Sequence, residues 1–209
     1  MARTAARGAE TRTRILEIAQ DAILQKGFDA TSIEEIVAAA EITKGGFFYH
    51  FPDKNALARA LIERHIEIED EIFDSLWARA RELNEDPLHS ALIGLRLLAE
   101  MLADMPNGHP GCIVATAAYQ DRLFDAAVRD LNRRAVLGWR ARFRAIFDEI
   151  AAVYPPREET DLDALADMVS TVVEGGIVMG KALGEPHMIV GQILLFRQFV
   201  KQAFQPPLH

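Results

Sequence analysis

The residues from Thr43 to Gly46 combine a short hydroxyl, a cation and two glycines at the start of a short predicted helix. Each glycine costs a helix roughly 1 kcal/mol relative to alanine, so the pair needs a reason other than helix stability. Bare backbone allows close approach to a groove floor, and its free N–H groups suit a phosphate. Lys44 can reach guanine acceptors in the major groove of DNA. Tyr49, His50 and Lys54 follow as phosphate donors, so the segment predicts a DNA-reading surface.

The elements that must position this segment are short helices. Upstream, apolar residues fall on one helical face and predict a first helix, which Gly27 ends in the left-handed conformation. Thr31 and Glu34, three residues apart, form a capping box that starts a second helix running to about Ala40.

Thr43 is the predicted N-cap of a third helix, and Pro52 closes the segment behind it. Only Glu41 and Ile42 connect the second helix to the third. Two short helices joined so tightly must cross steeply, as in a helix-turn-helix, and the later one then projects from the surface. Asp53 is the predicted cap of a long helix that follows.

Four aromatic residues follow the two glycines. Phe47 and Phe51 are four residues apart and are expected in the core. Phe48 and Tyr49 cannot both face inward with them, so at least one exposed ring is predicted. A small helical subdomain with an exposed aromatic turn would explain this pattern without DNA, and that alternative stays open.

The rest of the chain predicts a short helical piece and four longer helices, separated by proline and glycine. Their expected ranges are 87–105, 112–120, 123–154, 161–183 and 185–204. No run alternates with period two for long enough to predict a strand. The expected fold is all-α, with about nine helices: a helix-turn-helix domain of residues 1–54 and a helical bundle of residues 55–209 for ligand sensing and dimerisation.

Composition narrows the possible functions. The chain has 209 residues, 31 acids, 23 basic residues and one cysteine, with a formal net charge of −8. Residues 1–60 contain eight acids and eight basic residues, so a local DNA-binding patch is compatible with the acidic total. One cysteine excludes an intrachain disulfide framework. The low-charge stretches are interrupted by Glu174 or are too short to span a bilayer, so we expect a cytoplasmic protein with no membrane partner.

Residues 28–57, FDATSIEEIVAAAEITKGGFFYHFPDKNAL, resemble the DNA-binding signature of the TetR/AcrR family of bacterial transcriptional regulators. The resemblance covers about residues 10–60 and implies that the segment starting at Thr43 is the recognition helix. It implies base contacts by Lys44 and Gly45. The phosphate contacts that it implies are those of Thr31, Thr43, Tyr49, His50 and Lys54.

Two residues depart from the family pattern. Glu41 stands where the family usually has a turn glycine, so the bend must be made without the conformational ease of glycine. Phe48 stands where a tyrosine is common, so one hydroxyl contact to phosphate is expected to be missing.

The resemblance also implies a homodimer formed through the last two long helices, with an effector-binding domain at the C-terminal side. Both helices carry wide apolar surfaces that need cover, which a partner subunit would supply. A palindromic double-stranded DNA operator needs two readers about 34 Å apart. Packing of both helices inside one monomeric core is the alternative.

Ten residues are candidates for the effector pocket, because they lie on helices that surround the pocket in similar proteins. They are Trp77, Met101, Met105, Cys112, Thr116, Trp139, Phe143, Met168, Val172 and Glu174. Such a lining fits a small apolar or amphipathic molecule, and equally an ordinary helical core. The carboxylate of Glu174 could meet a cationic effector, or an arginine such as Arg134 or Arg140.

The resulting interpretation is a ligand-responsive repressor that a small effector releases from its operator. Cys112, at a predicted helix start, opens an alternative in which the regulator senses oxidants or electrophiles. A di-metal carboxylate enzyme would need glutamate three residues before histidine, and none of the six histidines has it. We therefore expect no enzyme, no metal and no cofactor. A helical adaptor that keeps the N-terminal unit without binding DNA is a further alternative.

Overall fold

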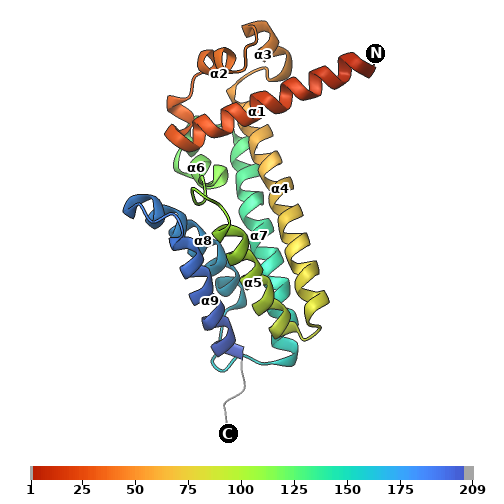
Figure 1. The fold of residues 1–209 in the computed structure, drawn as a ribbon, viewed down its shortest axis with the longest axis vertical. Coiled ribbons are helices and arrows are strands. Elements are labelled where there is room, and N and C mark those ends of the chain that lie inside the picture. Colours follow the sequence, from red (N-terminus) through yellow and green to blue (C-terminus); the bar gives the residue numbers. More distant parts are fainter. Residues whose placement is uncertain (1, 205–209) are drawn as a thin grey trace. The chain divides into compact units, whose positions relative to one another are not determined.

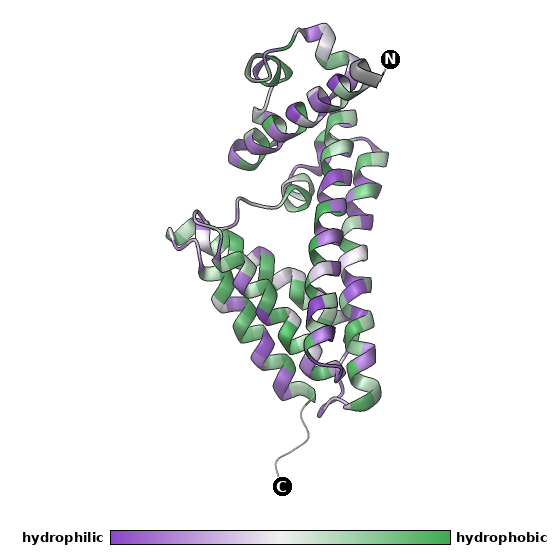
Figure 2. Cartoon of the chain, turned by 45° about the vertical axis from the view of Figure 1, so that its right-hand side comes forward, coloured by the Kyte–Doolittle hydropathy of each residue, from purple (hydrophilic) through white to green (hydrophobic). Residues whose placement is uncertain are grey.

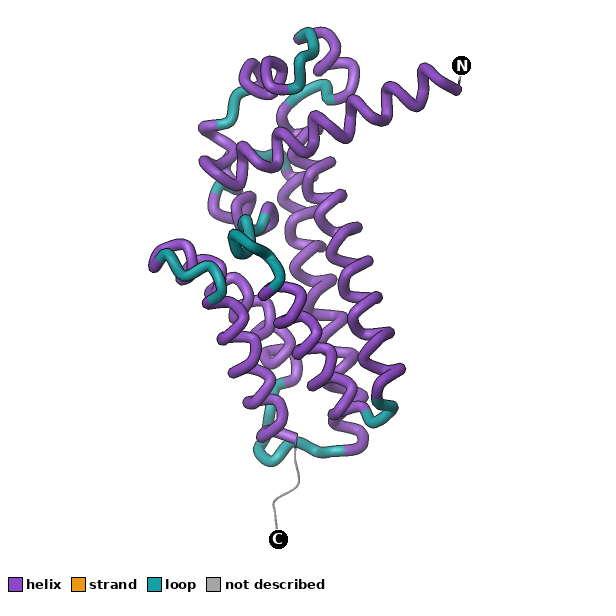
Figure 3. The backbone as a smooth tube through the Cα atoms, in the orientation of Figure 1, coloured by secondary structure: helices purple, strands orange, loops and turns teal. Residues whose placement is uncertain are grey.

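The computed structural model describes residues 2–204 (Figure 1). Side chains are described from residue 6 onward. Its regular elements are nine α-helices and one 3-10 turn, and the described residues contain no strand (Figure 3). The helices are α1 (Ala2–Ala30), α2 (Ile33–Ala39), α3 (Lys44–His50), α4 (Lys54–Leu83), α5 (Pro87–Ala103), α6 (Ile113–Tyr119), α7 (Ala126–Val153), α8 (Leu162–Leu183) and α9 (Met188–Phe204), with the turn η1 (Asp121–Leu123) between α6 and α7. The predicted all-α class is confirmed. No helix within residues 2–204 has the length and hydropathy needed to cross a membrane.

The chain divides into two compact units. The first unit contains the residues up to Ile68 together with Gly111–Ala135, and the second contains Glu69–Pro110 and the residues from Val136 onward. Helices α4 and α7 each contribute to both units. The domain boundary expected after residue 54 falls at the start of α4, inside the first unit. That residues 1–54 form the DNA-binding domain stays a prediction.

The core of the first unit is built from one face of α1, from α2 and α3, and from α6 with the adjoining parts of α4 and α7. Ile15 and Ile23 of α1 and Phe47 of α3 are buried, as their spacing predicts. Phe28 packs its ring edge to face against Phe124, with centroids 4.8 Å apart. These contacts fix α3 against the rest of the unit.

The end of α1 differs from the expectation in two ways. Gly27 has a positive φ of 89°, but its ψ of 167° is extended rather than left-handed helical. The predicted capping box of Thr31 is wrong by one residue: Ser32 is the N-cap of α2, and its hydroxyl accepts from the N–H of Glu35 at 3.1 Å. Thr31 is buried instead, and its hydroxyl donates to the carbonyl of Gly27 at 2.8 Å.

The turn from α2 to α3 is a Schellman motif. The N–H of Glu41 donates to Ala38 O, and the N–H of Ile42 donates to Val37 O, both at 3.2 Å. Glu41 occupies the left-handed position with φ of 52°, and it is the one non-glycine with positive φ among the described residues. The bend is therefore made without glycine, as the departure from the family pattern predicts.

Several helix ends match the expected caps. The side chain of Thr43 accepts from Gly46 N at the start of α3, and that of Asp53 accepts from Ala56 N at the start of α4. Two starts lie three residues later than expected. The turn η1 precedes α7, which begins at Ala126, and α9 begins at Met188 after a left-handed Gly184 ends α8.

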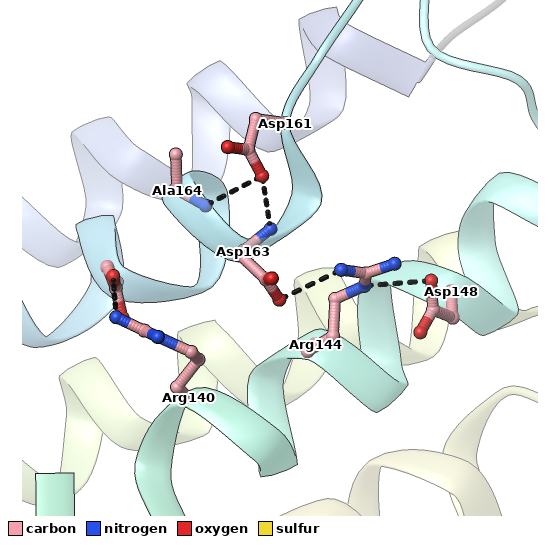
Figure 4. Close-up of polar contacts among 7 residues, drawn as sticks. Arg140, Arg144, Asp148, Asp161, Asp163 and Ala164 are labelled. Atoms are coloured by element: carbon pink, nitrogen blue, oxygen red, sulfur yellow. Dashed lines mark hydrogen bonds and ion pairs between the residues drawn. The ribbon is translucent and has the colours of Figure 1, made fainter. Parts of the chain in front are cut away.

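The second unit packs α5, α8 and α9 with the remaining parts of α4 and α7. Figure 2 shows more hydrophobic residues on α5, α8 and α9 than on α4 and α7. Helices α8 and α9 approach closely at Gly176, where an added Cβ would lie 2.8 Å from the Cα of Ile189. Ion pairs join α7 to α8 at the surface: Arg140 binds Asp167 through two hydrogen bonds and Arg144 binds Asp163 (Figure 4).

Candidate nucleic-acid interface

The N-terminal end of α3 is exposed and sterically bare. A Cβ added to Gly45 would meet nothing closer than Thr43 Oγ1 at 3.9 Å, so internal packing does not require glycine there. Thr43 is itself exposed, and its hydroxyl accepts from Gly46 N at 3.0 Å. A flat, accessible backbone surface with an adjacent hydroxyl is what close approach to a groove requires.

Lys44 is exposed beside this bare backbone. Its ammonium lies 2.6 Å from a carboxylate oxygen of Glu34 on α2, and that hydrogen bond lowers the pKa of Glu34. Exposed ion pairs are weak because water screens both charges. Lys44 can therefore exchange this partner for a DNA base or phosphate at little cost.

The aromatic residues of α3 divide as the sequence predicts. Phe47 and Phe51 are buried, whereas Phe48 is 41% and Tyr49 is 83% exposed. The rings of Tyr49 and His50 meet edge to face, with centroids 5.0 Å apart. The sequence predicts that at least one of Phe48 and Tyr49 is exposed, and in the structure both face outward. The Tyr49 hydroxyl is available to a phosphate.

Two of the predicted phosphate contacts have structural partners inside the first unit. Thr31 is fully buried with its hydroxyl bonded to Gly27. The ammonium of Lys54 donates to the carbonyl of Phe28, and partial burial lowers the pKa of Lys54. Both side chains bind backbone carbonyls at the C-terminal end of α1, and the burial of Thr31 leaves it no open path to a phosphate.

Gln120, at the end of α6, is a positioning residue that the sequence did not single out. Its Oε1 accepts from Phe28 N at 2.7 Å, and its Nε2 donates to Asp29 Oδ1 at 2.5 Å, which lowers the pKa of Asp29. The glutamine and its two partners are about ninety residues apart in the chain, so no local sequence signal identifies the contact. It ties α6 to the last turn of α1, beyond the kink at Gly27.

The candidate effector residues do not form a single cluster. Trp77 and Phe143 pack edge to face with centroids 5.4 Å apart, and Trp139 stacks on Phe143 at 5.7 Å. Met101 and Met105 pack around a second apolar cluster of the same unit, Val172 packs against both clusters, and Met168 is 37% exposed. Cys112 and Thr116 belong to the first unit, where the Thr116 hydroxyl donates to Cys112 O.

The arginines suggested as partners for Glu174 bind other acids. Arg134 pairs with Asp130 at 3.1 Å, and Arg140 pairs with Asp167 at 2.6 Å. Glu174 instead lies close enough to Glu69 to affect its titration. Burial of Glu69 and the neighbouring charge of Glu174 raise the pKa of Glu69 to about 7.

Cys112 is the N-cap of α6, as its predicted position at a helix start implies. Its sulfur accepts from Ala115 N at 3.4 Å and lies 3.8 Å from Nε2 of His65. Both contacts hold the sulfur at the start of α6.

Helices α8 and α9 carry large apolar side chains on their outer surface. Six of them are between 37% and 60% exposed: Met168, Val178, Met179 and Leu183 on α8, and Leu195 and Phe199 on α9. This is the outer apolar surface that the sequence predicts for these helices.

Comparison with known proteins agrees with the geometry of α2 and α3. Residues 15–61 match the family described as bacterial regulatory proteins, tetR family. The transcriptional regulator AcuR of Cereibacter sphaeroides is 28% identical over 167 residues, which cover 76% of this chain and 71% of AcuR. The transcriptional repressor BepR of Brucella suis is 35% identical over 89 residues, which cover 43% of this chain and only 41% of BepR.

Solved structures share the fold over almost the whole chain. A TetR transcriptional regulator from Chloroflexus aurantiacus has a TM-score of 0.76 and 24% identity, covering 94% of this chain and 97% of that one. The regulatory protein TetR from Rhodobacter sphaeroides has a TM-score of 0.72 and 22% identity, covering 89% and 96%. Residues 15–61 thus match the tetR family of bacterial regulatory proteins, and the chain shares the fold of solved TetR regulators over almost its whole length.

Proposed function

We propose that the protein represses transcription by binding a palindromic operator as a homodimer, and that a small apolar or amphipathic effector releases it. The observation that carries this proposal is the N-terminal surface of α3, where glycine and lysine are exposed without an internal packing role. Lys44 and Gly45 contact base edges, while Thr43, Tyr49 and His50 contact phosphates. Lys54 supports the surface from behind and adds positive charge.

The homodimer is proposed to form through α8 and α9. Support comes from their six exposed apolar residues and from two glycines on the same faces. Gly175 lies between Met168 and Met179 along α8, and Gly191 precedes Leu195 by one turn of α9. Space is open around both glycines, so a partner helix can approach closely there. Because the operator is chromosomal DNA, we place the protein in the cytoplasm.

Release is proposed to pass through α4 and α6. Helix α4 runs without a break from the first unit into the second, and α6 is tied to the segment before α2 by Gln120. An effector that prefers one arrangement of these helices shifts the population of DNA-competent dimers. By linkage, DNA weakens effector binding by the same factor.

The test compares Lys44→Ala with Lys26→Ala by fluorescence anisotropy on duplexes taken from the DNA flanking the protein's own gene. Lys26 is the matched control, because it also makes an exposed ion pair with a glutamate of α2. Lys44→Ala should reduce the preference for operator over random duplex at least about tenfold, whereas Lys26→Ala should leave it unchanged. Affinity should also fall steeply with salt. A protein that ignores every duplex at low salt is the helical adaptor instead.

Sensing of electrophiles by Cys112 is a second candidate function, favoured by the contacts of its sulfur with Ala115 N and His65. The thiolate would add to the β-carbon of an unsaturated carbonyl compound, whose displaced electron pair takes up a proton from water. Cys112→Ser should then hold the operator in the presence of such a compound while wild-type protein releases it. Equal release by both proteins excludes this function.

A further inference from the structure

Glu34 of α2 lies beside the lysine that is proposed to read DNA. Its Oε1 accepts from the ammonium of Lys44 at 2.6 Å, so α2 and α3 present an acceptor and a donor next to each other. Both side chains are more than half exposed, at 67% for Glu34 and 61% for Lys44. The pair therefore stands in the open, next to the bare backbone of Gly45 that a duplex would approach.

A second pair on α2 shows what is particular about this one. Glu35, the next residue, binds Lys26 of α1 at 2.5 Å, and its side chain is 44% exposed. Both glutamates lie in the first turn of α2, where the helix dipole favours an acid. They share charge, helix and type of partner, but Glu34 alone binds a residue of α3.

An acid in this position opposes the binding of DNA in general. Breaking the exposed ion pair costs little in water, because the solvent screens both charges. Against a duplex the same exchange is unfavourable: when Lys44 moves to a phosphate, the carboxylate of Glu34 is left unpaired beside a dense row of negative charges. Glu34 therefore weakens contacts that ignore the base sequence.

One base pair satisfies both charged groups at once. In the major groove guanine presents the acceptors N7 and O6, and the cytosine paired with it presents its N4 amino group as a donor. Lysine donates to the guanine acceptors, and a carboxylate accepts from the cytosine amino group. An A·T pair instead places the adenine amino group opposite the ammonium and a thymine oxygen opposite the carboxylate.

We propose that Glu34 is a specificity-determining residue that reads a G·C base pair of the operator together with Lys44. The ammonium donates to the guanine, and the carboxylate accepts from the N4 amino group of the cytosine, so both charges keep partners. On an A·T pair both charges lose them, and this penalty on wrong sequences supplies the discrimination. The inference rests on the proposed function, because it takes Lys44 as a base-reading residue.

The experiment uses the full-length protein and the operator located in the DNA flanking its own gene. The position is the guanine at which Lys44→Ala loses its discrimination between G·C and A·T in fluorescence anisotropy. The cytosine opposite is then replaced by 2-pyrimidinone, which lacks the N4 amino group and leaves the guanine in place. This replacement should weaken binding by the wild type about tenfold, and binding by Glu34→Ala by no more than about twofold.

Two further variants separate the hydrogen bond from the charge. Glu35→Ala is the matched control: it removes the adjacent acid and leaves the Lys44–Glu34 pair, so it should keep the full sensitivity to 2-pyrimidinone. Glu34→Gln keeps an acceptor without the charge and should keep most of that sensitivity. At low salt both Glu34 variants should bind random duplex at least about threefold more tightly than Glu35→Ala does.

Equal sensitivity of Glu34→Ala and the wild type to 2-pyrimidinone would overturn the inference. It also fails if Lys44 discriminates at a base pair without guanine, or if the Glu34 variants bind random duplex no better than Glu35→Ala. A wild type that binds no duplex, or a Lys44→Ala variant with undiminished operator preference, refutes the proposed function itself. A protein that reads its operator through Lys44 but tolerates 2-pyrimidinone refutes the role of Glu34 alone.

Discussion

Glu41 closes α2 in a conformation that L-amino acids disfavour, and this predicts an unusual stabilising substitution. Its φ of 52° completes the Schellman motif between α2 and α3. The left-handed conformation costs a non-glycine residue about 1–2 kcal/mol. Glycine removes that cost, but it also gives the unfolded chain more conformational entropy, which offsets part of the gain in stability. Glu41→Gly should therefore raise the free energy of unfolding by about 1 kcal/mol.

Glu41→Ala is the matched control, because it removes the same exposed charge but keeps the Cβ that makes the backbone strained. We expect it to stay within about 0.5 kcal/mol of the wild type. Urea denaturation followed by circular dichroism measures both variants, and the glycine variant should also melt about 2–4 °C higher. Hydrogen exchange of the α3 amides reports whether the gain is local. If alanine stabilises as much as glycine, the effect is one of charge and the argument from φ is refuted.

Two further predictions concern the second unit. Because burial and Glu174 raise the pKa of Glu69 to about 7 from 4.5, native Glu69 keeps a proton that the unfolded chain releases, so stability falls as pH rises through this window. Glu69→Gln should make the decrease in the free energy of unfolding with pH smaller by roughly 3 kcal/mol. Urea denaturation from pH 4 to pH 8 measures this decrease, and an unchanged pH profile would contradict the prediction. Gly176→Ala should lower the free energy of unfolding by about 1–3 kcal/mol, because its Cβ would collide with Ile189. Gly138→Ala, with open space around it, should raise it by about 1 kcal/mol. Melting temperatures that change in the same direction in both variants would refute the packing argument.

The local parts of the fold follow from the sequence because caps act within three residues. Thr43 and Asp53 start α3 and α4 where they were expected, since each satisfies a nearby backbone N–H. The error at the start of α2 has the same origin. Both Thr31 and Ser32 are followed by glutamate at the third position, so the sequence offers two adjacent capping boxes. The burial of Thr31 against Gly27 decides between them, and burial is a tertiary property.

Contacts between distant segments could not be predicted in this way. Apolar periodicity shows which face of a helix is buried, but it does not show which cavity that face lines. Trp77, Met101 and Cys112 all satisfy the same periodic rule, yet they lie in three different environments. The link from Gln120 to Phe28 has no periodic signal at all, because it depends on where α6 returns to the first unit. The residues of the proposed DNA-binding surface could be named from the sequence because they lie in one continuous stretch of chain.

Glycines with open space inside helices indicate where the molecule meets something else. A glycine such as Gly176 is explained by its own fold, because a Cβ would collide with a neighbouring helix. Gly45, Gly175 and Gly191 have no such neighbour, although each lowers the stability of its helix. All three lie on surfaces proposed to contact DNA or the partner subunit. A glycine there lets the DNA or the partner helix come close to the backbone. Gly8 of α1 and Gly138 of α7 are equally open, and nothing in the structure explains them. Most of the helix glycines that no packing contact explains therefore lie on surfaces where the proposed function requires contact with DNA or with the partner subunit.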